Sequence, residues 1–256
     1  MEPQQTSDTV AHFDRVALRY GRGPEILRDV SLELPAGSFH FLVGPCGAGK
    51  TSLLRLLYLR LLPSRGRVLL FGTDVGRVGR AELAALRRRI GIVFQDFRLL
   101  PQLTLLDNVA LPMRIAGGDD ATIRHDAIRL LERVGLKHLA HATPPALSGG
   151  QQQLAAIARA VIARPRLLIA DEPTASVDGA LAVRLILLFQ EMNRLGTTVL
   201  IATHNERLAD RFPHPRLRLE GGCIHGGITA RPGSAPPDSA LSSAHQRREA
   251  AAEIAL

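Results

Sequence analysis

The sequence predicts an α/β fold with a mostly parallel central sheet, an antiparallel β-subdomain near the N-terminus and an inserted α-helical subdomain. An apolar strand runs into a glycine-rich turn and then a helix at residues 39–57. Two further apolar strands, at residues 167–170 and 198–202, are separated by a helical pattern. Residues 104–163 lack a strand pattern and read as helices. Alternating strands and helices favour a parallel sheet with helices on its faces.

The first part of the chain predicts short strands separated by turns. Residues 13–20 form one strand, residues 30–34 alternate strictly between apolar and polar, and residues 38–43 are largely apolar. Glycine and proline at residues 21–24 and 35–37 mark the turns between them. We therefore expect the antiparallel β-subdomain in this region.

The turn after residues 38–43 has the spacing of a phosphate-binding loop. Two glycines flank four residues, and a lysine and a threonine follow directly. In this P-loop pattern the backbone wraps phosphates, the lysine meets the outer phosphates and the hydroxyl ligates magnesium. Only two of the 32 basic residues are lysines, yet one stands here. The predicted phosphate site comprises Gly44, Pro45, Cys46, Gly47, Ala48, Gly49, Lys50, Thr51 and Ser52.

The segments on both sides of the helical region continue the α/β alternation. We expect strands at 67–71, 90–94, 167–170 and 198–202, and helices at 80–89 and 179–195. The P-loop strand and the late strands can form one parallel sheet.

One domain of residues 1–228 is expected to contain a helical subdomain of about residues 96–163. Proline and glycine predict breaks in that subdomain at Pro112, at residues 117–118 and at residues 143–145. Residues 229–256 are rich in alanine, serine, proline and arginine, which predicts a disordered C-terminal tail.

Composition excludes several classes of protein. No stretch approaches the roughly 20 uncharged apolar residues of a membrane span, and the polar start MEPQQTSDTV is unlike a secretion signal, so we expect the chain in the cytosol. The two cysteines form neither a disulfide framework nor a ligand cluster. The net charge of +8 is densest in residues 55–98, where ten arginines accompany three acids. Without an aromatic platform, this patch favours an anionic lipid surface or an acidic partner, and nucleic acid is unlikely.

Two acids, Asp171 and Glu172, follow the apolar run of residues 167–170. The carboxyl edge of a parallel sheet is where nucleotides bind, so Asp171 is placed for magnesium and Glu172 for water. In isolation the segment would equally suit a buried strand with a solvated acidic end. The nearby P-loop makes the catalytic interpretation the stronger one.

A second anion-binding pattern, L-S-G-G-Q-Q-Q, occupies residues 147–153. It precedes a helix predicted to begin near Gln152, and helix N-termini attract anions. A second phosphate cradle has an evident use only if it serves another copy of the chain. On this string and the P-loop together, residues 11–228 resemble the ATP-binding subunits of ABC (ATP-binding cassette) systems.

The resemblance implies a homodimer in the ATP state, with two copies facing head to tail. The P-loop of one copy would close on Mg2+ATP against the L-S-G-G-Q segment of the other, which supplies Ser148, Gly149, Gly150 and Gln151. Asp178 would lie at the dimer interface near the opposite site.

The resemblance also implies roles for residues around the nucleotide. Tyr20 would stack on adenine, although it would also suit a core-packing aromatic. His204 would touch the γ-phosphate, although a histidine at a strand end is often structural. Glu172 would orient or deprotonate the attacking water, and Gln95 would reach both that water and magnesium. The implied magnesium ligands are therefore Thr51, Gln95 and Asp171.

Residues 93–112, V-F-Q-D-F-R-L-L-P-Q-L-T-L-L-D-N-V-A-L-P, are similar to the FtsE-type cassettes of cell division. This implies an FtsX-like permease as the partner and a peripheral place at the cytoplasmic face of the bacterial inner membrane. Cassettes of lipoprotein release and macrolide export share most of the motifs and remain alternatives. Leu154 stands where such cassettes usually carry arginine, which puts the hydrolysis rate in question.

Two other classes of P-loop protein fit the sequence less well. A kinase or GTPase would need an acceptor site or the guanine-reading N-K-x-D string, and neither is apparent. A soluble ABC protein acting on nucleic acid or ribosomes would usually carry two cassettes or a long coiled insertion.

Overall fold

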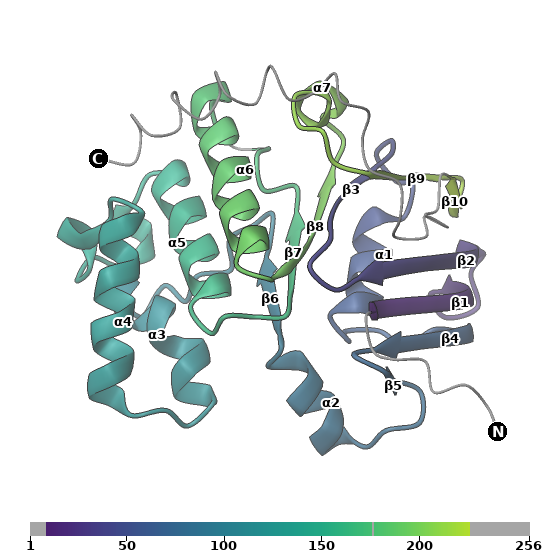
Figure 1. Cartoon of the computed structure of the whole chain (residues 1–256), viewed down its shortest axis with the longest axis horizontal. Helices are drawn as coiled ribbons and strands as arrows, with labels where there is room; N and C mark the ends of the chain where they lie inside the picture. Colours follow the sequence, from purple (N-terminus) through teal and green to yellow (C-terminus); the bar gives the residue numbers. More distant parts are fainter. Residues whose placement is uncertain (1–8, 176, 226–256) are drawn as a thin grey trace.

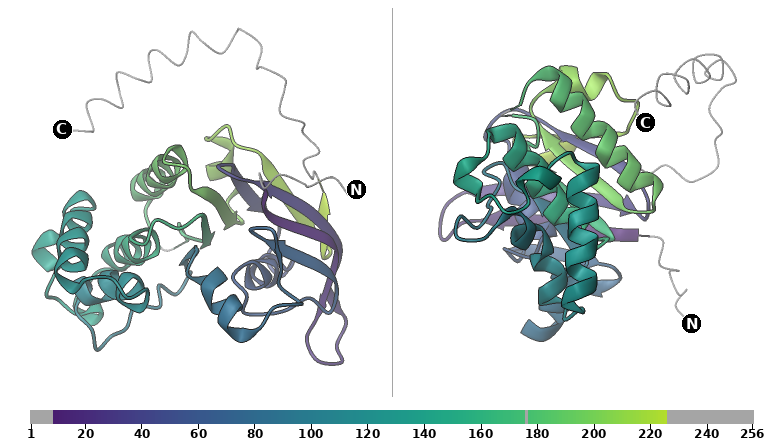
Figure 2. Two further views of the ribbon diagram at one scale, coloured as in Figure 1. Left: turned by 60° about the horizontal axis from the view of Figure 1, so that its bottom comes forward. Right: turned by 90° about the vertical axis from the view of Figure 1, so that its left-hand side faces the viewer.

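The computed structural model describes residues 9–175 and 177–225, so the predicted tail at 229–256 lies outside the described residues. The described chain forms a four-stranded sheet, a six-stranded sheet and a set of helices. Figure 1 and Figure 2 show the four-stranded sheet and the helices α3, α4 and α5 at opposite ends of the molecule, with the six-stranded sheet between them.

The four-stranded sheet is antiparallel and has the order β2-β1-β4-β5. Its strands are β1 (Thr9–Arg19), β2 (Glu25–Pro35), β4 (Arg65–Leu70) and β5 (Thr73–Asp74). The first two begin earlier than the sequence predicts. Arg15 and Asp29 adopt positive φ angles of 47° and 48°, and the β1–β2 register shifts between Phe13 and Val16. Such irregularities interrupt the apolar–polar alternation by which strands are recognised.

The six-stranded sheet has the order β10-β9-β3-β8-β7-β6. It comprises β3 (Phe39–Val43), β6 (Ile90–Val93), β7 (Leu167–Asp171), β8 (Thr198–Thr203), β9 (Arg216–Glu220) and β10 (Cys223–His225). β3 pairs in parallel with β8, and β7 pairs in parallel with both β8 and β6. The prediction of one parallel sheet containing the P-loop strand and the late strands is confirmed. The sequence did not predict β9 and β10, which are short and rich in polar residues.

Apolar helices cover both faces of this sheet. On one face, α1 (Lys50–Leu57) buries Leu53, Leu54 and Leu57 in a cluster shared with β1, β2 and β4. On the other, α6 (Gly179–Arg194) packs Leu185 and Phe189 against β3, β7 and β8. α2 (Arg80–Arg87) precedes β6, and α7 (Glu206–Asp210) follows β8. None of the helices within the described ranges has the length and apolarity that crossing a bilayer requires.

The helices between β6 and β7 have a buried cluster of their own. They are α3 (Leu105–Ile115), α4 (Asp120–Arg133) and α5 (Gly149–Val161), with 3-10 turns at η1 (Lys137–Leu139) and η2 (Pro144–Ala146). The predicted break at Pro112 is wrong because this residue lies inside α3. The buried side chains of Leu105, Leu106 and Val109 fix the preceding turns, so packing outweighs the cost of one missing hydrogen bond.

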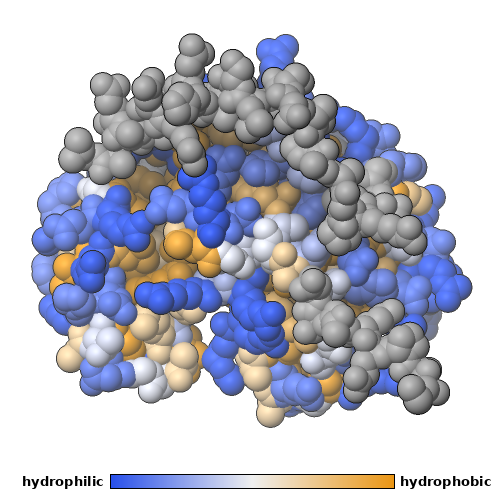
Figure 3. Space-filling view, viewed as in Figure 1, coloured by the Kyte–Doolittle hydropathy of each residue, from blue (hydrophilic) through white to orange (hydrophobic). Residues whose placement is uncertain are grey.

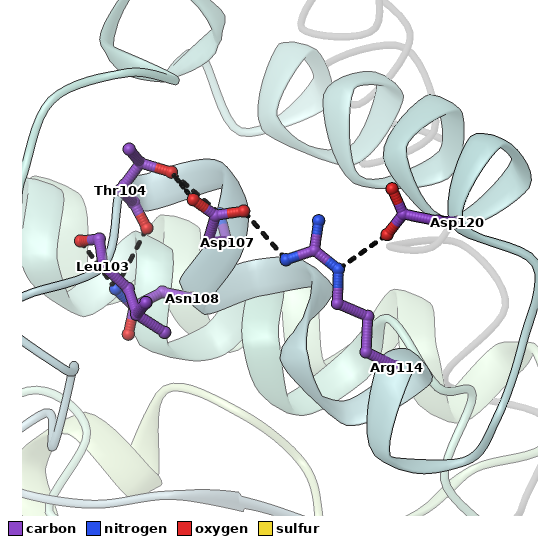
Figure 4. A network of polar contacts seen from close by, with 6 residues as sticks. All are labelled: Leu103, Thr104, Asp107, Asn108, Arg114 and Asp120. Atoms are coloured by element: carbon purple, nitrogen blue, oxygen red, sulfur yellow. Dashed lines mark hydrogen bonds and ion pairs between the residues drawn. The ribbon is translucent and has the colours of Figure 1, made fainter.

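Buried Asn108 organises the segment that leads into α3. Its Oδ1 accepts from the Leu100 amide at 2.7 Å, and its Nδ2 donates to the carbonyls of Leu100, Leu103 and Thr104 at 3.0, 3.2 and 3.0 Å. Figure 4 shows Asn108 beside Leu103 and Thr104, with Asp107 turned toward Arg114. These bonds anchor the end of the connection from β6.

We expect Asn108→Ala to lower the free energy of unfolding by about 2–4 kcal/mol, because it leaves buried backbone groups without partners. Urea unfolding followed by circular dichroism measures the change. Gln102→Ala, at an exposed position of the same segment, is the control. An Asn108→Ala midpoint equal to that of the control would contradict this account of the anchor.

His40 in β3 is only 1% exposed, and neither ring nitrogen has a hydrogen-bond partner among the described residues. Burial, with a smaller contribution from nearby His214, lowers the pKa of His40 from 6.5 to about 4. As the pH falls below 6.5, the unfolded chain takes up the proton before the folded one does. The fold is therefore destabilised progressively between pH 6.5 and about 4, by about 3 kcal/mol in total.

Replacing His40 with Phe is expected to flatten the pH dependence of stability over this interval. Urea midpoints at pH 7, 6, 5 and 4 (about one-unit steps across the titration) measure this dependence, with His12→Gln, at an exposed position of β1, as the control. A slope in the His40→Phe protein as steep as that of the unmodified chain would assign the effect to other groups.

Candidate nucleotide-binding site

Four parallel strands bring the predicted site residues to one edge of the sheet. β3, β6, β7 and β8 end at Val43, Val93, Asp171 and Thr203. Their parallel register places these ends together, since Val43 pairs with Thr203 and Val93 with Ala170. The P-loop, Gln95, Glu172 and His204 therefore follow neighbouring strand ends, as the sequence predicts.

The P-loop backbone requires glycine at two positions. Gly44 has a φ of 154°, and a Cβ there would lie 2.2 Å from the carbonyl oxygen of Leu219. Gly49 has a φ of 105° and is the N-cap of α1. Side chains rarely adopt such angles, so both glycines let the backbone fold tightly over the start of the helix.

The start of α1 presents positive charge to the loop. Gly49 supplies no side-chain cap, and the first turn holds no acidic residue. The free amides and the helix dipole therefore favour an anion. The ammonium of Lys50, which is only 8% exposed, donates to the carbonyls of Gly44 at 2.7 Å and Pro45 at 3.2 Å. It also lies 3.8 Å from a carboxylate oxygen of Glu172, so it spans the loop and the acidic strand end.

Asp171 and Thr51 offer oxygen atoms that suit a hard cation. Burial raises the pKa of Asp171 above its usual value, and the nearby Thr51 hydroxyl opposes this shift. Within the described ranges, no three His, Cys, Asp or Glu residues gather as a metal site. A cation here would be bound jointly by these protein oxygens and by phosphate oxygens, as magnesium usually is.

Glu172 is held from two directions. Its backbone amide donates to Ala202 at 2.9 Å, and its φ of 47° is strained for a residue with a side chain. Its carboxylate, 11% exposed, lies 2.9 Å from Nδ1 of His204. The sequence interpretation assigned His204 to the γ-phosphate without foreseeing this contact. The pair fixes the carboxylate at the sheet edge, next to Lys50.

The side chain of Tyr20 lies beside the start of α1. Its hydroxyl is 3.2 Å from the Ser52 hydroxyl and accepts a 3.2 Å hydrogen bond from Arg55, a bond that raises the pKa of Arg55. Because 40% of Tyr20 is exposed, it is not a core aromatic. Its ring therefore remains free for the predicted stacking on adenine.

The L-S-G-G-Q segment forms the start of α5, whereas the P-loop lies between β3 and α1. Ser148 caps the helix by accepting from the Gln151 amide at 3.3 Å, and the Gln151 side chain accepts from the Ser148 amide at 2.9 Å. The helix therefore begins at Gly149, and the predicted start near Gln152 is wrong. Ser148 and Gly149 are exposed, which leaves this helix end accessible to another molecule.

The described contacts give Asp178 a structural role as well. It caps α6 by accepting from the Leu181 amide at 2.8 Å, yet the residue remains exposed. Neither Asp178 nor the start of α5 contacts the P-loop within the described hydrogen bonds and ion pairs.

Residues 27–175 match the family described as ABC transporter. The chain belongs to the ABC transporter family. The cell division ATP-binding protein FtsE of Haemophilus influenzae is 44% identical over 213 residues, covering 83% of this chain and 98% of that protein. FtsE of Escherichia coli K12 is 43% identical over 216 residues, covering 84% and 97%.

Solved structures agree with this assignment. The ATP-binding cassette MJ0796, in a dimeric post-hydrolysis state bound to ADP and Pi, superposes with a TM-score of 0.78 at 32% identity. The match covers 84% of this chain and 96% of that cassette. The ABC ATPase fold, the ATPase class and the similarity to FtsE predicted from the sequence are confirmed. The roles of the individual site residues stay predictions.

The structure adds one residue near the ABC site that the sequence interpretation missed. On α5, the guanidinium of Arg159 donates to the carbonyls of Arg98 and Phe97, 61 and 62 residues earlier, in the connection that carries Gln95. The only signal in the sequence is an arginine within the otherwise apolar helix pattern of residues 154–162.

Proposed function

We propose that this ABC cassette hydrolyses Mg2+ATP as a head-to-tail homodimer and serves as an FtsE-type ATPase in cell division. The observation that carries the proposal is the 44% identity to FtsE over nearly the whole of that protein. The structure supports the chemistry through one sheet edge that gathers the P-loop, Asp171, Glu172 and His204.

The chain's own groups would bind and orient the triphosphate. Lys50 and the amides at the start of α1 hold the phosphates. Thr51, Asp171 and Gln95 would hold magnesium, which would supply positive charge to the phosphate oxygens. The carboxylate of Glu172, which lies 2.9 Å from Nδ1 of His204, would accept a proton from the attacking water, and His204 would also contact the γ-phosphate.

Closure by a second copy would complete the site. In this arrangement Ser148, Gly149, Gly150 and Gln151 of one copy contact the ATP held by the P-loop of the other, and Asp178 lines the interface. The exposed helix end at Ser148 supports this proposal. The dimeric structures of MJ0796 are consistent with it.

The chain would act at the cytoplasmic face of the bacterial inner membrane through an FtsX-like permease. We place the contact beside the exposed residue Gln95, where β6 leads to the helical insert formed by α3, α4 and α5. Figure 3 shows a notch in the surface between the insert and the part of the molecule that carries α2.

An anionic lipid surface is a further proposed contact. Of the ten arginines in residues 55–98, four pair with acids, namely Arg65, Arg67, Arg77 and Arg98. Exposed Arg80 and Arg88, on or next to α2, have no acidic partner among the described residues, which leaves them available for lipid phosphates.

Affinity capture from membranes tests the partner. Tagged Glu172→Gln protein in MgATP should retain a four-span FtsX-like protein, and Lys50→Ala should not. Recovery of a lipoprotein-release or macrolide-export permease in its place would keep the ATPase chemistry and overturn the cell-division assignment.

A further inference from the structure

Arg159 joins α5 to the connection that follows β6. Its guanidinium donates through Nη1 to the Arg98 carbonyl at 2.5 Å and through Nη2 to the Phe97 carbonyl at 2.7 Å. The guanidinium makes no ion pair with any acid within the described residues. A partly buried cation that donates hydrogen bonds to two adjacent carbonyls constrains the position and the orientation of that backbone.

The backbone that Arg159 holds is strained. Phe97 and Arg98 have φ angles of 57° and 50°, which residues with side chains rarely adopt. The turn is closed by the Phe97 amide on the Phe94 carbonyl at 3.1 Å, and the Arg98 side chain covers the Phe94 ring at 4.1 Å. Two consecutive left-handed residues persist only when their surroundings stabilise them.

The two ends of this connection are anchored elsewhere. Upstream, β6 is paired with β7 in the sheet. Downstream, Leu100 is tied to α3 by Asn108. The backbone between these two anchors includes Gln95. Among the hydrogen bonds of the described residues, this stretch receives side-chain bonds from another element through Arg159.

We infer that Arg159 is a positioning residue that sets the place of Gln95 and couples it to the helix end that Ser148 caps. Arg159 stands eleven residues beyond Ser148, or about 16 Å along a rigid helix. A movement of the start of α5 against a second copy would therefore carry the Gln95 turn with it. This inference rests on the proposed function, in which Ser148 and Gln95 both serve ATP hydrolysis.

Kinetics of Arg159→Met test the inference, because methionine fills similar space and donates no hydrogen bond. We expect the dissociation constant for ATP without magnesium to stay within about twofold, and kcat to fall by at least about tenfold, because a misplaced group costs rate without costing ground-state binding. Arg159→Lys keeps a cationic hydrogen-bond donor at this position, so its kcat should be higher than that of Arg159→Met. Arg87→Met is the matched control, since its guanidinium donates to the Leu59 carbonyl at 2.7 Å away from Gln95.

A double variant separates positioning from general stability. If Arg159 acts through Gln95, adding Arg159→Met to Gln95→Ala should lower kcat by less than about twofold beyond Gln95→Ala alone. A full multiplicative loss, or loss of ATP binding in both Arg159 variants, would overturn the inference.

Amide hydrogen exchange tests the same inference without a measurement of ATP hydrolysis. In Arg159→Met, and more weakly in Arg159→Lys, amides of residues 95–99 should exchange faster, while those of α1 stay unchanged. Unchanged exchange at 95–99 would overturn the positioning role even in an inactive protein. Faster exchange in a chain that does not hydrolyse ATP would uphold the positioning role and reject the proposed function.

Discussion

Glu172→Gln is expected to retain ATP and to lower the hydrolysis rate by about 10²–10⁴-fold, the usual contribution of a general base. The amide keeps the size of the side chain and a hydrogen bond to His204, 2.9 Å away, but it cannot accept the proton of the attacking water. Steady-state phosphate release measures the rate, and size-exclusion chromatography in MgATP should show accumulation of a closed dimer.

Glu206→Gln serves as the control for this change, because Glu206 pairs with Arg218 at 2.8 Å just beyond β8 and takes no part in the proposed site. Its rate should match that of the unmodified chain. A Glu172→Gln protein that hydrolyses ATP at the normal rate would show that the base is another group.

Lys50→Ala is expected to weaken ATP binding by at least about 100-fold, because charge-assisted hydrogen bonds to phosphate contribute roughly 1.5–3 kcal/mol each. Equilibrium binding of a fluorescent ATP analogue measures the loss. The sequence offers a matched control, since Lys137 is the other lysine of the chain and pairs with Glu132 on the surface at 2.7 Å.

Lys137→Ala should bind the analogue as the unmodified chain does. Equal affinities for the two lysine variants would contradict the assignment of the P-loop. The melting temperature of Lys50→Ala must be recorded as well, because removing a buried cation near Glu172 also changes the local charge balance.

The positions of the candidate site residues follow from the sequence where chemistry and topology are local. The P-loop spacing and the acids after β7 are contiguous strings, and parallel pairing places both at one edge without further information. Strand starts were harder to predict. Bulges at Arg15 and Asp29 break the alternation that marks a strand, and nothing in the neighbouring residues announces them.

Long-range contacts account for the remaining gaps. Arg159 and the Phe97 carbonyl are 62 residues apart, so their bond depends on how α5 packs and cannot be inferred from either segment alone. The contact of His204 with Glu172 likewise needs the β7–β8 pairing. Pro112 shows the opposite case, in which a strong local signal yields to the packing of α3.

The packing of Leu154, which stands where the resemblance implied arginine, suggests what this difference does. Leu154 is partly buried and packs against both the cluster around α6 and the cluster of the helical insert. At the position where the resemblance implied arginine, this chain has an apolar contact that joins the insert to the sheet core. We expect this contact to stiffen the junction between the insert and the sheet core.

Mixing two inactive variants tests the head-to-tail dimer most directly. Lys50→Ala removes the P-loop function, and Gly149→Asp places a negative charge at the exposed start of α5. In a head-to-tail pair, each mixed dimer regains one site made of an intact P-loop and an intact L-S-G-G-Q segment. An equimolar mixture should therefore recover roughly a quarter of the normal ATPase rate, since half of random pairs are mixed and each holds one of two sites. A mixture that stays inactive, although native mass spectrometry shows mixed dimers in MgATP, would contradict the account.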